Sequence, residues 1–108
     1  MLAISISQLE EVMYARITTF RMNTEKSDDA LALTEELRPE IMAIPGIKYW
    51  FDLGNEDGNT AVIAIYESEE AAEAAKGTAG ALFARFADYM ETEPQPQGYE
   101  VLLHGINP

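Results

Sequence analysis

The chain has 108 residues, the size of one domain, and its 47% apolar content excludes a disordered protein of low hydrophobicity. Acidic residues outnumber basic ones 19 to 7, and the resulting net charge of -12 argues against nucleic acid and anionic membranes as partners. The absence of cysteine excludes disulfides, thiolate chemistry and cysteine-ligated metals, and it fits a reducing cytoplasm.

Residues 1–12 do not continue into the pattern that follows them. They lack the positive charge and apolar core of a cleaved secretory signal, and no apolar run approaches the roughly 20 residues of a membrane span. We therefore expect a cytoplasmic protein with an N-terminal extension over residues 1–12 and a compact domain over residues 13–108.

The first half of this domain reads as a strand and a helix. Residues 13–22 are rich in β-branched and aromatic side chains, which is typical of a strand. Ser27, followed by two aspartates, is predicted to cap a helix whose apolar stripe ends at Ile44. Pro39 should kink this helix, and Pro45-Gly46 should end it.

A hairpin and a second helix follow. Residues 47–53 and 60–66 predict two antiparallel strands, because the segment between them is rich in glycine and asparagine. Ser68 is predicted to cap the second helix. The glycines within residues 77–80 should interrupt this helix, which then continues to Glu91.

The last predicted strand spans residues 99–106. The polar segment before it, residues 91–97, contains two prolines and cannot join a central strand. The complete order is strand, helix, strand, strand, helix, strand. This order predicts an α+β protein with a ferredoxin-like βαββαβ fold, in which a four-stranded antiparallel sheet carries two helices on one face.

Alternation along the strands divides the sheet residues into two sets. The nearly continuous apolar set, which includes Ile17 and Phe51, is expected under the helices. The second set mixes polar and aromatic side chains and includes Arg16, Trp50, Tyr66 and His104. On the open face it would form an apolar patch larger than a soluble monomer usually exposes, so we predict a homodimer in which two such faces meet.

Three stretches carry a resemblance to a known family: residues 13–16, 44–47 and 65–71. Through them, residues 13–107 resemble the antibiotic biosynthesis monooxygenase-like family of dimeric α/β barrels. The resemblance implies a homodimer whose sheets close into a barrel, with a ligand pocket between sheet and helices in each subunit. Some members oxidise quinol-like or polyketide aromatics with dioxygen and need neither metal nor flavin, so no cofactor is expected.

Other members of that family degrade haem, using an asparagine on the first strand and a tryptophan and a histidine on the second helix. The matching positions here hold Thr19, Ala75 and Arg85. The resemblance therefore argues against haem degradation for this chain.

Two groups of residues are candidates for a site. His104 is the single histidine and could act as a general base, and Arg16, Trp50 and Tyr66 share its parity. These four would meet the partner subunit, or line the helix-side pocket if the faces are reversed. The candidates for the pocket lining, or for an ordinary core, are Thr19, Tyr49, Phe51, Phe83 and Phe86. The adjacent acid pairs point in different directions, so no metal site is expected.

Two functions remain open. The leading hypothesis is a cofactor-independent monooxygenase acting on a small aromatic or quinol compound, which rests on the family resemblance. The alternative is a non-catalytic dimer that binds a small apolar molecule or serves a stress or regulatory role. The absence of a nucleophile and base at a fixed spacing favours this second hypothesis.

Overall fold

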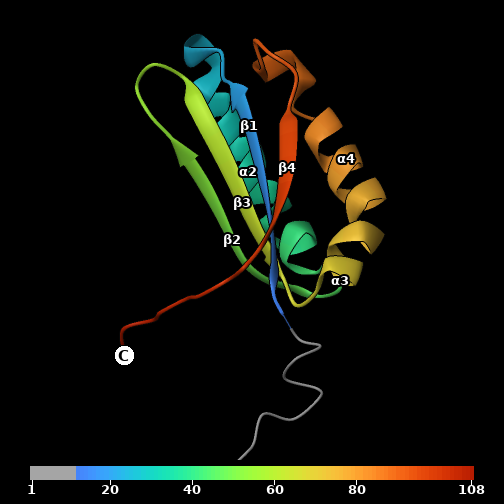
Figure 1. Ribbon diagram of the computed structural model, residues 1–108. Helices are drawn as coiled ribbons and strands as arrows, with labels where there is room; N and C mark the ends of the chain where they lie inside the picture. The colour runs from blue at the N-terminus through green and yellow to red at the C-terminus, as the bar shows by residue number, and fades with distance from the viewer. Residues whose placement is uncertain (1–11) are drawn as a thin grey trace, which may run out of the picture.

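The computed structural model describes residues 12–108, which form one four-stranded antiparallel sheet with helices on one side (Figure 1). The elements in chain order are β1 (Tyr14–Arg21), η1 (Thr24–Lys26), α2 (Ser27–Met42), β2 (Ile47–Gly54), β3 (Asn59–Tyr66), α3 (Glu69–Ala74), α4 (Lys76–Ala84), η2 (Ala87–Tyr89) and β4 (Gln95–Glu100). The strand order β2-β3-β1-β4 confirms the predicted ferredoxin-like α+β fold. Residues 1–11 lie outside the description, so a domain boundary near Met13 stays a prediction.

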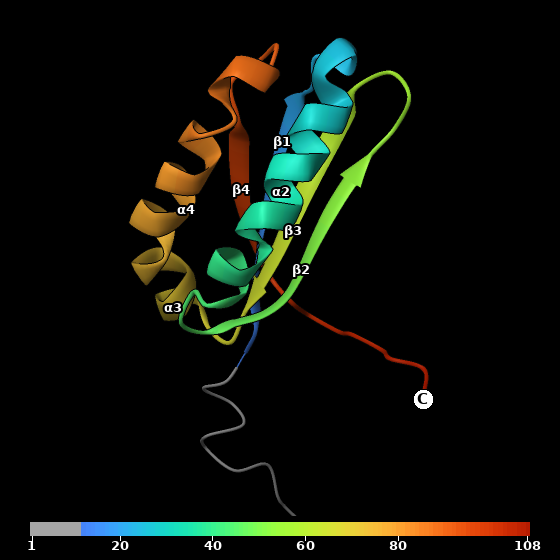
Figure 2. The ribbon, with the colours of Figure 1, turned by 180° about the vertical axis from the view of Figure 1, so that it is seen from behind.

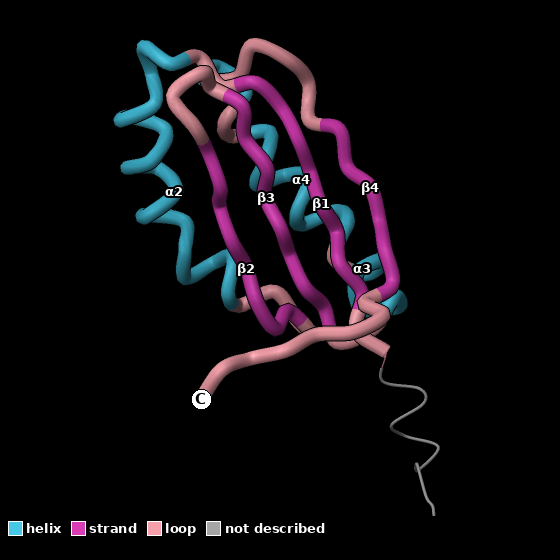
Figure 3. The backbone as a smooth tube through the Cα atoms, turned by 60° about the vertical axis from the view of Figure 1, so that its left-hand side comes forward, coloured by secondary structure: helices cyan, strands magenta, loops and turns pink. Residues whose placement is uncertain are grey.

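All helices pack on the same face of the sheet. Figure 2 shows α2 in front of the strands on one side and α3 and α4 along the other. Figure 3 shows the opposite face, where the four strands lie side by side without a covering helix. Within residues 12–108, no helix has the length and apolar character that a bilayer crossing requires.

The start of α2 differs from the prediction. Ser27 is the first residue of the helix and not its cap, because a short 3₁₀ turn precedes it. The side chain of Asn23 caps that turn by accepting a hydrogen bond from the Glu25 backbone N–H at 3.0 Å. Pro39 lies inside α2, which continues to Met42.

The second helical region begins as predicted and then departs from the prediction. The Ser68 side chain accepts a hydrogen bond from the Ala71 backbone N–H at 3.0 Å, which confirms the cap. The break lies at Ala75, and both Gly77 and Gly80 are inside α4. A glycine inside a helix costs only about 1 kcal/mol, which tertiary packing overrides here. The continuation to Glu91 is wrong, since α4 ends at Ala84.

The last strand is also earlier than predicted. β4 spans Gln95–Glu100 and pairs with β1 from Thr19↔Gln95 to Tyr14↔Glu100. The pairing of β4 with the antiparallel β1 ends at Glu100, opposite the first residue of β1, so residues 101–108 form no strand. Pro96 is accommodated because β4 is an edge strand, where one side of the backbone needs no partner.

Gly46 joins the two halves of the fold. Its φ of 84° is unfavourable for residues with a side chain, and a Cβ there would lie 2.6 Å from the Ala71 Cβ. Its carbonyl accepts a hydrogen bond from the Glu67 backbone N–H at 2.8 Å. The turn after α2 is thereby held directly against the junction between β3 and α3.

The strand residues fall into the two predicted sets, but each set lies on the opposite face of the sheet from the one predicted for it. Register pairs Trp50 with Ala64 and Arg16 with Ala64, and this set lies under the helices. Tyr49 and Phe51 belong to the other set, and they are 41% and 50% exposed. Alternation encodes only the grouping, whereas the handedness of the strand-helix-strand crossovers selects the face that the helices cover.

Candidate functional site

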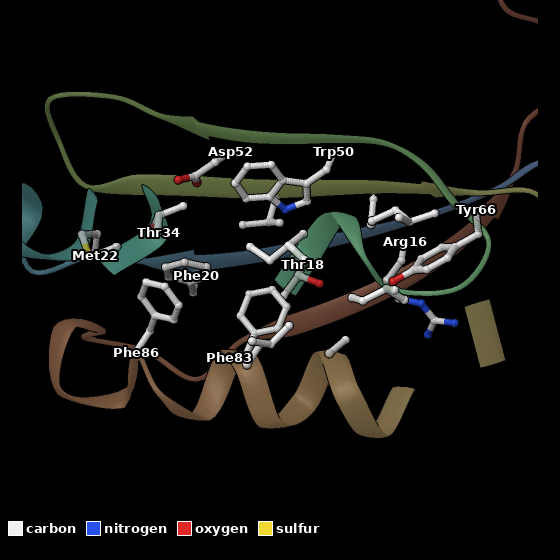
Figure 4. A pocket seen from close by; sticks show the side chains of 17 residues that line it. Arg16, Thr18, Phe20, Met22, Thr34, Trp50, Asp52, Tyr66, Phe83 and Phe86 are labelled. Atoms are coloured by element: carbon white, nitrogen blue, oxygen red, sulfur yellow. The ribbon is translucent and has the colours of Figure 1, made fainter. Parts of the chain in front are cut away.

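A cavity of about 90 Å³ lies between the sheet and the helices (Figure 4). A single water needs roughly 10–15 Å³ of such space, so the cavity could hold about six to nine waters. The side chains around it come from β1, β2 and β3 on one side and from α2, α4 and the turn after α4 on the other. Most of them are apolar, which is typical of a small-molecule site.

Aromatic side chains form the walls of this cavity. Trp50 enters from β2, Phe20 from β1, and Phe83 and Phe86 from α4 and the turn after it (Figure 4). The rings of Phe20 and Phe83 meet edge to face, with centroids 6.2 Å apart and an angle of 82°. Flat aromatic walls of this kind favour a flat ligand.

One end of the cavity carries a cation and a phenol, Arg16 and Tyr66 (Figure 4). The Arg16 Nη2 atom donates to the Glu73 Oε2 atom at 3.3 Å, and the Lys76 Nζ atom lies 3.0 Å from the same oxygen. The hydrogen bond from Lys76, and then the one from Arg16, lower the pKa of Glu73. Glu73 therefore stays ionised and orients the Arg16 guanidinium.

Tyr66 is 3% exposed and belongs to the buried core at this end. Burial raises the pKa of its phenol, while the positive charge of Arg16 partly opposes that rise. The phenol is therefore neutral at physiological pH and can donate a hydrogen bond. Together, Arg16 and Tyr66 suit a ligand with an oxygen that carries negative charge.

Arg16 is also supported by the ring of Tyr14, whose centroid lies 5.8 Å from the guanidinium carbon. The Tyr14 ring lies across β4 at Gly98, where a Cβ would come within 2.7 Å of the Tyr14 Cζ atom. Gly98 therefore makes room for the ring, and the ring helps to hold the guanidinium.

Asp52 enters from β2 and lies beyond Trp50, away from Arg16 (Figure 4). Among the described residues that line the cavity, it is the one carboxylate. It keeps contact with solvent because β2 is an edge strand, yet partial burial raises its pKa. Asp52 is not among the residues predicted for the site, although it is an acid two residues after Trp50 and shares its parity.

The structure brings together some of the predicted site residues. Arg16, Trp50 and Tyr66 line the cavity, as they should with the faces reversed, and the predicted pocket residues Phe83 and Phe86 join them. Thr19, Tyr49 and Phe51 do not line it, because their parity directs them to the open face of the sheet.

His104 does not reach the cavity. It lies exposed in the segment after β4, which runs away from the body of the domain (Figure 1). Its predicted convergence with Arg16 and Trp50 assumed a strand through residue 106, and β4 ends at Glu100. Within residues 12–108, no three histidine or acidic side chains gather in a way that could hold a metal ion.

No protein-family model matches the chain, and no curated protein matches it in sequence. Solved structures do match. A protein of unknown function from Nitrosomonas europaea, NE2512, superposes with a TM-score of 0.75 at 18% identity, covering 92% of this chain and 98% of its own. A second protein of that organism, provisionally named an antibiotic biosynthesis monooxygenase, has a TM-score of 0.72 at 21% identity, with 85% and 92% covered.

A third similar structure contains a ligand. The monooxygenase ActVA-Orf6 of Streptomyces coelicolor, in complex with nanaomycin D, has a TM-score of 0.69 at 18% identity and covers 91% of this chain and 94% of its own. At these identities the likeness establishes the fold. The predicted resemblance to the antibiotic biosynthesis monooxygenase-like proteins is thus confirmed as a shared fold.

Proposed function

We propose that this protein is a homodimer that binds a small aromatic or quinol compound and oxidises it with dioxygen, without a bound cofactor. The observation that carries this proposal is the aromatic-walled cavity with Arg16 and Tyr66 at one end. The similar monooxygenase from Streptomyces coelicolor, which was solved with nanaomycin D, supports the same substrate class by analogy.

The reaction converts a phenol with a free ring C–H into a quinone, and dioxygen is the oxidant. One oxygen atom forms the new ring carbonyl, and the other leaves as water with the hydroxyl proton and the displaced ring proton. The ring loses four electrons, and dioxygen gains them. In this reaction the protein holds the ring flat, excludes water around it and stabilises the ring anion that reacts with dioxygen.

Arg16 is the residue that suits stabilisation of the ring anion. Its side chain is 19% exposed, so its charge acts at short range with little screening by solvent. Glu73 and the Tyr14 ring hold the guanidinium in place before the ligand binds. Such preorganisation is what makes electrostatic stabilisation effective.

Oxygen uptake with a panel of hydroquinones and naphthols tests the proposal, using protein treated with a chelator. Trp50→Ala removes an aromatic wall of the cavity and should lower kcat/KM by about two- to twelvefold, since an aromatic contact contributes about 0.5–1.5 kcal/mol. Leu31→Ala is the matched control, because Leu31 is 59% exposed and does not line the cavity. Equal rates for both variants would contradict the proposed site.

A second function, non-catalytic binding of a small apolar molecule in this cavity, is favoured by the position of His104. The single histidine of the chain lies outside the cavity. Thermal stabilisation by naphthols without oxygen uptake by any member of the panel would support binding alone.

The proposed dimer rests on the open face of the sheet. Apart from Arg21 at the end of β1, its outward positions are uncharged: Ala15, Ile17 and Thr19 on β1, Tyr49, Phe51 and Leu53 on β2, Ala61, Ile63 and Ile65 on β3, and Gln95, Gln97 and Tyr99 on β4. Tyr49, Phe51, Leu53 and Tyr99 are each 41% to 50% exposed there. A largely apolar face without acidic side chains, on a chain of net charge -12, is where two copies can meet with the least repulsion.

The size of this face is consistent with a second copy as its partner. Strands of six to eight residues at ordinary spacing give a flat area on the order of 400–500 Å², and its pleated, accessible surface is larger. A stable interface uses about 800 Å² per partner. The segment after β4 adds apolar surface at Leu102, Leu103 and Ile106, which are 85%, 93% and 69% exposed.

A further inference from the structure

We propose that Asp52 receives a hydroxyl group of the aromatic ligand, accepting its hydrogen bond when the ligand binds and its proton when the ring is activated. This inference rests on the proposed function, and it assigns a role to a residue at the end of the cavity opposite Arg16.

The register of the sheet separates the two charged ends of the cavity. Asp52 pairs with Val62, and Val62 pairs with Thr18, whereas Arg16 lies two residues from Thr18 on β1. Two strand spacings and two residues along the strand give about 12 Å between the Asp52 and Arg16 Cα atoms. That distance is longer than one aromatic ring, and the Trp50 side chain lies between the two ends (Figure 4).

Within residues 12–108, no lysine or arginine side chain forms an ion pair with Asp52. Beside it in the cavity lie Thr34 of α2, Phe86 from the turn after α4 and Met22 after β1, all uncharged (Figure 4). On α2, Arg38 is paired with Glu35, and both side chains are more than half exposed. Across the cavity, the titratable groups are Arg16 and Tyr66. Asp52 itself stays exposed, so at this otherwise apolar end of the cavity its carboxylate is an acceptor that a ligand with a hydrogen-bond donor can reach.

The same environment favours proton transfer. An ordinary aspartate and an ordinary phenol differ by about six pKa units, which makes the transfer unfavourable. Burial raises the pKa of Asp52, and a cation at the far end of the ring lowers the pKa of the bound hydroxyl, so both effects narrow the gap. In this step the ligand O–H bond breaks, an O–H bond forms on the carboxylate, and the negative charge left on the ligand oxygen delocalises into the ring toward Arg16.

A binding cycle under nitrogen tests this role separately from oxidation. The probes are 1-naphthol and 1-methoxynaphthalene, which differ in their ability to donate a hydrogen bond, and the proteins are the wild type and Asp52→Asn. We expect the wild type to prefer 1-naphthol by about tenfold or more at pH 8, in line with a hydrogen bond to a charged acceptor. The preference should fall as the pH is lowered toward 4, because Asp52 becomes protonated.

In Asp52→Asn the preference should shrink to less than about threefold and lose its dependence on pH. An equal loss of affinity for both probes, or an unchanged pH-dependent preference, would overturn the assignment. Failure of both probes to bind would overturn it together with the proposed function. A preference that depends on Asp52 in a protein that consumes no oxygen would retain the assignment and reject only the oxidation.

Discussion

Replacement of Phe51 by aspartate tests whether the open face of the sheet is the dimer interface. The Phe51 side chain is half exposed in the single subunit. Aromatic side chains bury 150–250 Å² in full, so each copy has about 100 Å² left to bury, worth about 2.5 kcal/mol at 25 cal/mol per Å². A twofold axis doubles this to about 5 kcal/mol, which predicts a Kd for dimerisation weaker by at least about three orders of magnitude.

Sedimentation equilibrium measures this change directly. The wild type should behave as a particle of about 24 kDa, twice the chain mass of 12.0 kDa, at micromolar concentration. Phe51→Asp should sediment as a 12.0 kDa monomer with an unchanged far-ultraviolet circular dichroism spectrum. Leu31→Asp is the matched control, since it makes the same kind of change on an exposed part of α2.

Two results would refute the reasoning. A wild-type chain that is monomeric at 100 µM would mean that the open face needs no second copy. A Phe51→Asp variant that stays dimeric would mean that the copies meet elsewhere. Trp50→Asp, by contrast, does not test the interface, because Trp50 lines the cavity under the helices.

The remaining predictions concern stability. Gly98→Ala should lower the free energy of unfolding by about 1–3 kcal/mol in urea titrations, because the new Cβ collides with the Tyr14 ring. Gly80→Ala should raise the free energy of unfolding by about 0.5–1 kcal/mol, because Gly80 lies inside α4 and its new Cβ meets nothing within 4 Å. Because the pKa of Asp52 is raised, its carboxyl stays protonated to a higher pH in the folded state than in the unfolded state. Ionisation of Asp52 therefore lowers the free energy of unfolding as the pH rises above about 3.9. Asp52→Asn should therefore raise Tm at pH 7 and have almost no effect at pH 3, and a lower Tm at pH 7 would contradict that sign. Ser68→Ala should cost about 1 kcal/mol by removing the cap of α3, and a melting curve identical to that of the wild type would argue against the cap.

Local side-chain chemistry accounts for what could be predicted from the sequence. The order of strands and helices follows from alternation, from helical stripes and from turn residues, and Ser68 caps its helix because its hydroxyl is adjacent to free backbone N–H groups. The grouping of Arg16, Trp50 and Tyr66 on one face could be predicted in the same way, since successive strand residues point to opposite sides.

Contacts between distant residues decided the rest. Which face the helices cover depends on the handedness of the crossovers, so alternation alone placed Tyr49 and Phe51 on the wrong side of the sheet. The last strand ends at Glu100 because its partner β1 begins at Tyr14, and this removed His104 from the predicted cluster. Asp52 became a candidate only when it lined the same cavity as side chains of α2 and of the turn after α4, because the environment of a carboxylate is set by neighbours that lie far from it in the chain.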